Sequence, residues 1–395
     1  MVKVAYVISA ISSDNTGMGG SYRSLMALAS GMIESGSDAK IFALGDIYPI
    51  SYQGSSVPVE HINFKSPFRY WKEVLAGIAS YAPTHLHAFD NKSYFFARLV
   101  ARKLRIPVVL TRPGGPNPTR YFPHSKDVVA FSEENSNYFR KLGKLKDSSV
   151  HLIPNRISEF DLCSVQEAAL RNELKADGGD VIVLRICRIS PAYEESIHQA
   201  ANLTKALNKA SVPARLVVVG LIQDQSAYDR VRSIDGIRTD FVTDPRYTLD
   251  AKKLIGLGDV VVGVGRGFME AALHGKILLS PVKGEDLPAL VVPSNFEQLA
   301  RTNFSPRGAV PGHRAEESFR MLLDLLHDPK AASDYSTYIK SVARDRFSIS
   351  RGVEKHLHVY RSRTNYTASG ILDHALNFVV VARFYLPVML GIRLK

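Results

Sequence analysis

The stretch DVVVGVGRGFMEAALHGK, residues 259–276, has the pattern of a buried strand, a glycine loop and the start of a helix. Glycines let a backbone approach a ligand closely, and the free N–H groups of a first helical turn attract an anion. Arg266 adds a permanent positive charge that suits phosphate oxygens. Glu270, acceptor-only when ionised, suits two neighbouring ribose hydroxyls. The stretch indicates a nucleoside diphosphate site. The alternative is a plain tight turn, in which Glu270 only interacts favourably with the dipole of the helix from its first turn.

Alternating strand and helix patterns extend from this stretch in both directions. VAYVISAI and PVVLT belong to a first series, and VIVLRICRI opens a second. Such alternation is typical of parallel sheets with crossover helices. A polar, strandless stretch from Ser158 to Asp180 separates the series and is the expected domain boundary. The sequence therefore predicts an α/β protein with two Rossmann-like, doubly wound domains that face a cleft, where ligands bind at the carboxyl ends of the strands.

Length and charge narrow the classes of function. At 395 residues the chain exceeds the usual size of one core, which also favours two domains. Fifty lysines and arginines against 38 aspartates and glutamates give a net charge of +12, which favours anionic partners. Cys163 and Cys187 have no metal-ligand or redox spacing, so a reduced, cytoplasmic protein is expected. The apolar start is predicted to be a first strand rather than a signal peptide.

Several motifs together resemble a known enzyme family. The order and spacing of GGSYRSLMALASGM, PVVLTRPGG, HLIPNRIS, RICRISPAYEES, LVVVG and GRGFMEAALHGK are similar to those of retaining glycosyltransferases of family 4, which have the GT-B fold. The resemblance extends to about Tyr360. It implies transfer of a sugar from a UDP- or GDP-sugar to a glycan, with retention of anomeric configuration. The expected acceptor is a lipid-linked intermediate of cell-surface polysaccharide synthesis, such as capsule or O-antigen.

The resemblance also implies a division of labour along the chain. Residues 1–160 are the expected acceptor-binding domain, 161–345 the nucleotide-sugar domain, and 346–364 a closing helix that returns to the first domain. An apolar and basic tail occupies residues 365–395. No D-x-D motif occurs, so no metal cofactor is expected, and helix N-termini and arginines would stabilise the leaving diphosphate.

Site residues follow from the same resemblance. The loop GMGGS, residues 17–21, is similar to a family loop that approaches the donor diphosphate or the acceptor. Arg188 matches a basic residue that binds donor phosphate, and Glu270 matches the glutamate that holds the donor ribose. The predicted donor-binding residues are Gly19, Gly20, Arg188, Arg266, Gly267, Phe268 and Glu270.

Three further residues are candidates for the catalytic group. Arg112 takes the place of a family histidine in the loop after PVVLT. His87, at the end of the predicted strand THLHAF, is a candidate contact for the acceptor or the transferred sugar, and Asp90 is an alternative hydroxyl-binding group. A hydrogen-bonded core histidine is an equally open interpretation of His87.

Other positions depart from the family pattern and keep alternatives open. Val262 stands in place of the first glutamate of a pair, Tyr193 in place of a lysine, and Arg156 in place of the glycine of PNG. Arg266 is a candidate replacement for the lysine charge. These departures allow a catalytically silent, glycosyltransferase-like partner subunit. A nucleotide-cofactor oxidoreductase is disfavoured, because GMGGS is not G-x-G-x-x-G. Nucleic-acid binding is not predicted, since the charge is dispersed and no nucleic-acid motif is recognisable.

The most apolar stretch is ILDHALNFVVVARFYLPVMLGIRLK, residues 371–395. It approaches the length of a bilayer span, but Asn377 and Arg383 would be costly inside one. We therefore predict attachment to the inner face of the cytoplasmic membrane, with Arg393 and Lys395 facing anionic headgroups. A helix packed on the N-terminal domain and a dimer contact are the alternatives, and the oligomeric state is left open.

Overall fold

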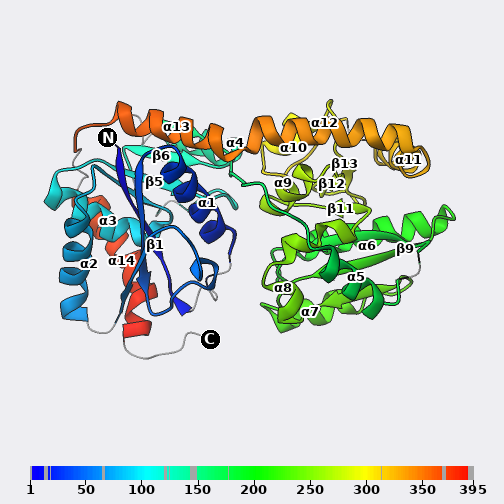
Figure 1. Cartoon of the computed structure of the whole chain (residues 1–395), viewed down its shortest axis with the longest axis horizontal. Coiled ribbons are helices and arrows are strands. Elements are labelled where there is room, and N and C mark those ends of the chain that lie inside the picture. Colours follow the sequence, from blue (N-terminus) through cyan, green and yellow to red (C-terminus); the bar gives the residue numbers. More distant parts are fainter. Residues whose placement is uncertain are drawn as a thin grey trace. The chain divides into compact units, whose positions relative to one another are not determined.

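A computed structural model describes residues 2–12, 17, 19–64, 67–119, 122–123, 125–142, 149–176, 178–312, 314–366 and 371–389 (Figure 1). The chain divides into two compact units. Unit 1 contains residues 1–156 and 348–395, and unit 2 contains residues 157–347. The polar stretch predicted as the domain boundary begins just after the first crossing between units, and it contains the helix α5 (Ser164–Glu173).

Unit 1 is built on a parallel sheet of seven strands with the order β3-β2-β1-β4-β5-β6-β7. The strands are β1 (Lys3–Ser9), β2 (Asp38–Gly45), β3 (Val59–Asn63), β4 (His85–Ala88), β5 (Val108–Arg112), β6 (Asp127–Ala130) and β7 (Ser149–Leu152). Nearly all of β1 is buried because helices cover both faces of the sheet, so its sequence reads as a continuous apolar run.

Two helical layers enclose this sheet. Val4, Tyr6 and Ile8 of β1 point into one apolar cluster, and Ala5 and Val7 point into another, as alternation along a strand requires. The first cluster includes side chains of α1 (Gly20–Glu34) and α13 (Ile349–Ser362), and the second those of α2 (Pro67–Tyr81), α3 (Asn91–Leu104) and α14 (Ile371–Met389). The 3₁₀ helix η2 (Ile50–Tyr52) and helix α4 (Glu133–Lys141) complete the elements of the unit.

Unit 2 has a six-stranded sheet with the order β10-β9-β8-β11-β12-β13, parallel except for β13. Its strands are β8 (Val181–Ile186), β9 (Ala214–Val219), β10 (Thr239–Val242), β11 (Val260–Val262), β12 (Ile277–Ser280) and β13 (Ala289–Leu290). Besides α5, its helices are α6 (Glu194–Lys209), α7 (Gln225–Arg232), α8 (Pro245–Thr248), η4 (Ala251–Leu257), α9 (Arg266–Leu273), α10 (Phe296–Ala300), α11 (Ala315–His327) and α12 (Pro329–Phe347). One apolar cluster fills the unit.

Both sheets reverse their strand order at a single point. In unit 1 the chain goes from β1 to β2 and β3 on one side, then returns to place β4 on the other side of β1. Unit 2 does the same around β8, with β9 and β11 as its neighbours. The predicted fold class, two doubly wound α/β units, is therefore confirmed. In such sheets ligands bind outside the carboxyl ends of the strands at the reversal point.

The apolar tail forms the helix α14, which packs on unit 1. Figure 1 shows α14 in red, and it contacts α3. Val381 and Tyr385 are buried in the cluster on that face of the sheet. Within the described ranges, none of the helices combines the length and the hydropathy that a membrane span requires. Arg393 and Lys395 lie outside the described residues.

Candidate functional site

The reversal point of unit 2 brings together residues that follow β8 and β11. Arg188 lies just beyond the end of β8, and α9 begins just beyond the end of β11. A Cβ added to Gly267, in the first turn of α9, would lie 3.8 Å from the carbonyl oxygen of Ile186, the last residue of β8. The first turn of α9 is thus placed against the carboxyl end of β8, where Arg188 follows.

The glycine loop has the shape that this close packing needs. A Cβ on Gly263 would lie 2.7 Å from the Cα of Phe268, so no larger residue fits there without movement. Gly265 has a φ of +55° and donates its N–H to the carbonyl oxygen of Asn303 at 2.9 Å. It is also the N-cap of α9 and provides no side-chain cap. The positive end of the helix dipole therefore faces the loop without a carboxylate or hydroxyl cap of its own.

Arg266 and Glu270 form an ion pair on one face of α9. Arg266 Nε donates to Glu270 Oε1 at 2.7 Å, and the two side chains are 13% and 8% exposed. The spacing of four residues places them one above the other on the helix. The two side chains predicted to bind phosphate and ribose thus contact each other, and the pair holds the guanidinium beside the glycine loop.

Two arginines of the RICR sequence support the loop from β8. Arg188 is half-buried, donates from Nη2 to the hydroxyl of Tyr193 at 3.3 Å, and lies over that ring at 5.7 Å. Arg185, which sequence reasoning missed, is 1% exposed. It donates to Ser196 Oγ at 2.9 Å and, from Nη1, to the carbonyl oxygen of Val262 at 3.3 Å. Tyr193, in place of the family's lysine, therefore holds Arg188, while Arg185 joins the ends of β8 and β11.

Phe268 and Val262 belong to the core of unit 2. Phe268 is fully buried and stacks on Phe304, with ring centroids 3.6 Å apart and planes 9° from parallel. Phe304 covers the ring of Phe268, and the predicted donor contact of Phe268 stays a prediction. Val262, where the family pattern has a glutamate, ends β11 with its side chain fully buried. The apolar residue at that position serves packing.

The reversal point of unit 1 contains Asp90. Its Oδ2 accepts from the N–H and the hydroxyl of Ser9 at 2.8 and 2.9 Å, and its Oδ1 accepts from the N–H groups of Lys92 and Ser93. Asp90 is therefore the N-cap of α3 and ties that helix to the end of β1. Four donors already use its two oxygens, which gives Asp90 a structural role between β1 and α3. Its predicted hydroxyl-binding role stays a prediction.

His87 belongs to β4, in the sheet of unit 1. It is fully buried, with Nδ1 hydrogen-bonded to the hydroxyl of Tyr360 and Nε2 to that of Thr111, both at 2.6 Å. Burial, and next the nearby His356 and His85, hold the pKa of His87 well below its usual value, so the ring stays neutral. This geometry is that of a hydrogen-bonded core histidine, and an acceptor contact of His87 stays a prediction.

The remaining predicted residues of unit 1 lie at the carboxyl edge of its sheet. Arg112 ends β5, is half-buried, and donates from Nη2 to the carbonyl oxygen of Pro116 at 2.7 Å. Gly19 is the N-cap of α1 and Gly20 its first residue, and a Cβ on Gly20 would meet no atom within 4 Å. Tyr22 donates its hydroxyl to the carbonyl oxygen of Ser9, which fixes α1 at the end of β1. Met18 of the predicted glycine loop lies outside the described residues.

Comparisons with known proteins give a match in fold. The sequence matches no protein-family model and no curated protein. Among solved structures, HepE of Anabaena in complex with UDP and glucose is 16% identical, with a TM-score of 0.64 over 92% of this chain and 100% of that one. A glycosyltransferase of Rickettsia africae is 14% identical, with a TM-score of 0.63 over 91% and 98%. The chain has the GT-B fold. A sucrose-phosphate synthase of Thermosynechococcus elongatus has the same fold at 15% identity, with a TM-score of 0.57 over 91% and 99%.

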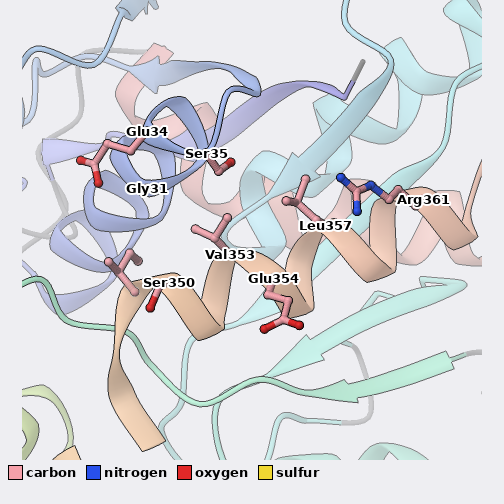
Figure 2. A pocket seen from close by; sticks show the side chains of 9 residues that line it. Gly31, Glu34, Ser35, Ser350, Val353, Glu354, Leu357 and Arg361 are labelled. Atoms are coloured by element: carbon pink, nitrogen blue, oxygen red, sulfur yellow. The ribbon is translucent and has the colours of Figure 1, made fainter. Parts of the chain in front are cut away.

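The GT-B chain also has a cavity in unit 1 that is separate from the predicted residues. The cavity has a volume of about 360 Å³ and lies between the last turn of α1 and α13. Figure 2 shows the side chains that line it. The residues that line it include Gly31, Glu34, Val353 and Glu354. The fifteen residues of α1 span about 22 Å, so the cavity lies at the end of this helix opposite Gly20.

In the part of the chain that the structure describes, no three side chains of histidine, cysteine, aspartate or glutamate form a group able to hold a metal ion. The expectation of a reaction without a metal stays a prediction.

Proposed function

We propose that this protein is a glycosyltransferase that uses a nucleotide-diphosphate sugar, a UDP- or GDP-sugar, as its donor. One observation supports the proposal: at the reversal point of unit 2, the uncapped N-terminus of α9, with its Arg266–Glu270 pair, lies against the carboxyl end of β8, and Arg188 follows that strand two residues later. Similarity in fold to a structure that contains UDP and glucose supports the same choice of ligand.

Each part of the site matches one part of such a donor. The diphosphate would accept hydrogen bonds from the first-turn N–H groups of α9 and from the guanidinium groups of Arg188 and Arg266. A carboxylate has two oxygens, so Glu270 can accept from Arg266 and from ribose hydroxyls at the same time. Arg266 thereby positions Glu270, and both groups act on one ligand.

The chemistry proposed is sugar transfer with retention of anomeric configuration. As the bond between the sugar and the diphosphate breaks, negative charge grows on the leaving phosphate oxygen. Fixed positive charges and helix dipoles stabilise that charge without reorganising, which is a large source of catalysis in buried sites. The acceptor hydroxyl loses its proton to the departing phosphate oxygen. The proposed acceptor is a glycan on a lipid-linked intermediate of cell-surface polysaccharide synthesis.

A second candidate is a catalytically silent partner subunit that binds the same nucleotide. Two observations favour it: a buried valine replaces the first glutamate of the family pair, and His87 is enclosed in the core. Release of UDP from a UDP-sugar distinguishes the two candidates, because a silent subunit binds the nucleotide without turnover.

The first experiment is a thermal-shift series with UDP, GDP, CMP, ADP and NAD. A ligand that binds only the native state raises the melting temperature. We expect a shift with UDP or GDP that is lost in Glu270→Ala and Arg266→Ala. The matched control is Glu316→Ala, an exposed glutamate in the first turn of α11, which should keep the shift. Unchanged affinity in both site variants would refute the site, and a shift with NAD alone would favour an oxidoreductase.

A further inference from the structure

The helix α14 exposes an apolar face, unlike an ordinary surface helix. Its outer face is formed by Ala375, Phe378, Val379, Ala382 and Leu386, which share one side at helical spacing. Phe378, Val379 and Leu386 are 58%, 67% and 47% exposed. These three are among the ten large apolar side chains that are exposed in the described part of the chain, and only on α14 do three share one face. An ordinary surface helix places polar residues on that side.

The inner face of α14 carries polar groups into the protein. Asn377 is fully buried, and Arg98 of α3, also fully buried, donates from Nη2 to its Oδ1 at 3.4 Å. The amide of Asn377 donates to the carbonyl oxygen of Asn91 at 3.4 Å. Tyr385 packs against Phe64, Tyr70 and Phe96 with ring centroids 5.1, 6.4 and 5.3 Å away. The helix thus packs on unit 1 through Asn377, Val381 and Tyr385, and a second apolar side remains exposed.

The positive charges near α14 indicate what kind of partner its apolar outer face would bind. Arg383 is exposed at the edge of the outer face, and Arg102 and Lys103 are exposed in the last turn of α3, which contacts α14. The sequence after the helix adds Arg393 and Lys395, and the whole chain carries a net charge of +12. A second copy of the chain would bring a like charge toward this face. An anionic bilayer instead offers an apolar layer beneath a negative surface.

We propose that the outer face of α14 inserts into the boundary between headgroups and acyl chains of an anionic bilayer, and so holds unit 1 on the membrane. The exposed rings and branched side chains lose contact with water, and Arg383 stays at the level of the headgroups. This proposal does not depend on the donor site, because it concerns binding and not turnover.

The test is flotation of the purified full-length protein with phosphatidylcholine vesicles, with and without phosphatidylglycerol. We expect binding to the anionic vesicles that weakens as salt is added. The triple variant Phe378→Ser, Val379→Ser, Leu386→Ser should bind at least about a hundredfold more weakly, because three apolar side chains no longer enter the bilayer. The double variant Val165→Ser, Leu249→Ser removes two exposed apolar side chains of unit 2 and should bind like the parent protein.

A second measurement places the helix itself. Trp71 is the only tryptophan of the chain, so Trp71→Phe with Phe378→Trp puts a single fluorophore on the outer face. Its emission should shift to the blue with anionic vesicles. Vesicle binding that the triple variant retains would overturn the proposal. So would absence of vesicle binding combined with a concentration-dependent dimer that the triple variant abolishes, since a second copy would then cover the face.

Discussion

The side chain of Arg156 occupies the space that a Cβ on Gly352 would need. A Cβ built there would lie 2.4 Å from Cγ and 2.6 Å from both Cδ and Nε of Arg156. Arg156 is 4% exposed, and burial, with a smaller effect from the charge of Arg351, lowers its pKa to about 10. The arginine that departs from the usual PNG motif is thus accommodated by a glycine in the first turn of α13.

We expect Gly352→Ala to lower the free energy of unfolding by about 1–2 kcal/mol, because the new methyl group overpacks a buried side chain. In an Arg156→Ala background the same change should become stabilising by about 0.5–1 kcal/mol, since alanine is the better helix former. Urea denaturation of the parent protein, the two single variants and the double variant measures both effects. Equal effects in both backgrounds would contradict the contact.

Acid should destabilise unit 1 through His356. This ring is 2% exposed, donates from Nδ1 to the carbonyl oxygen of Gly352, and has a pKa lowered to about 4, chiefly by burial. An unfolded histidine titrates near 6.5, so between about pH 6.5 and 4 the unfolded state binds more protons. Stability is therefore complete above about pH 6.5 and falls by up to about 1.4 kcal/mol per pH unit below it.

The measurement is urea denaturation between pH 4.5 and 7.5, compared with His356→Leu. Other buried histidines add to the slope of the parent protein, so the informative quantity is the reduction of slope in the variant. His358→Leu, an exposed residue two positions along the same helix, is the matched control and should leave the slope unchanged. A parent-like slope in His356→Leu would refute the assignment.

Phe268 should affect stability but not nucleotide affinity. Phe268→Leu removes the stack on Phe304 and should cost about 1–3 kcal/mol, less than the 3–5 kcal/mol of a change from phenylalanine to alanine. The thermal shift with nucleotide should persist. Phe304→Leu removes the other ring of the stack and should give a similar loss. Lost nucleotide binding at unchanged stability would restore Phe268 as a donor contact.

Asp90 should stabilise the folded protein, because it joins the end of β1 to the start of α3. Asp90→Ala leaves four donors without their acceptor and should cost about 2 kcal/mol, whereas Asp90→Asn keeps one oxygen and should cost about half as much. Calorimetric unfolding measures both. Asp224→Ala is the control: this residue caps α7 alone, so its loss should be smaller. An Asp90→Ala protein as stable as its parent would contradict the role.

The fold could be predicted because the sequence patterns that indicate it lie within single strands, loops and helices. Strands buried on both faces read as apolar runs such as VAYVIS, and the glycine loop carries its own constraint at Gly263 and Gly265. The ends of β8 and β11 follow from strand order, so the position of the start of α9 at the carboxyl end of β8 could also be predicted. Local patterns thus fixed the two sheets and the elements of the candidate donor site.

The missed contacts are those between distant parts of the sequence. His87 meets Tyr360 across 273 positions, and no pattern near THLHAF indicates a partner in α13. The stack of Phe268 on Phe304 could not be predicted either, because no local sequence pattern links the two residues. In α14, apolar residues occupy both the buried and the exposed side, so periodicity does not show which side is buried. The burial of Asn377, Val381 and Tyr385 against unit 1 shows it.

The route of the chain between the units sets an order of events during synthesis. Unit 2 is one continuous segment, whereas unit 1 needs residues 348–395, which leave the ribosome after all of unit 2. Segments fold as units when their contacts are complete, so unit 2 can finish while the sheet of unit 1 still lacks α13 and α14. Until then the apolar faces that these helices cover, including Tyr6 and His87, stay open to chaperones and to aggregation.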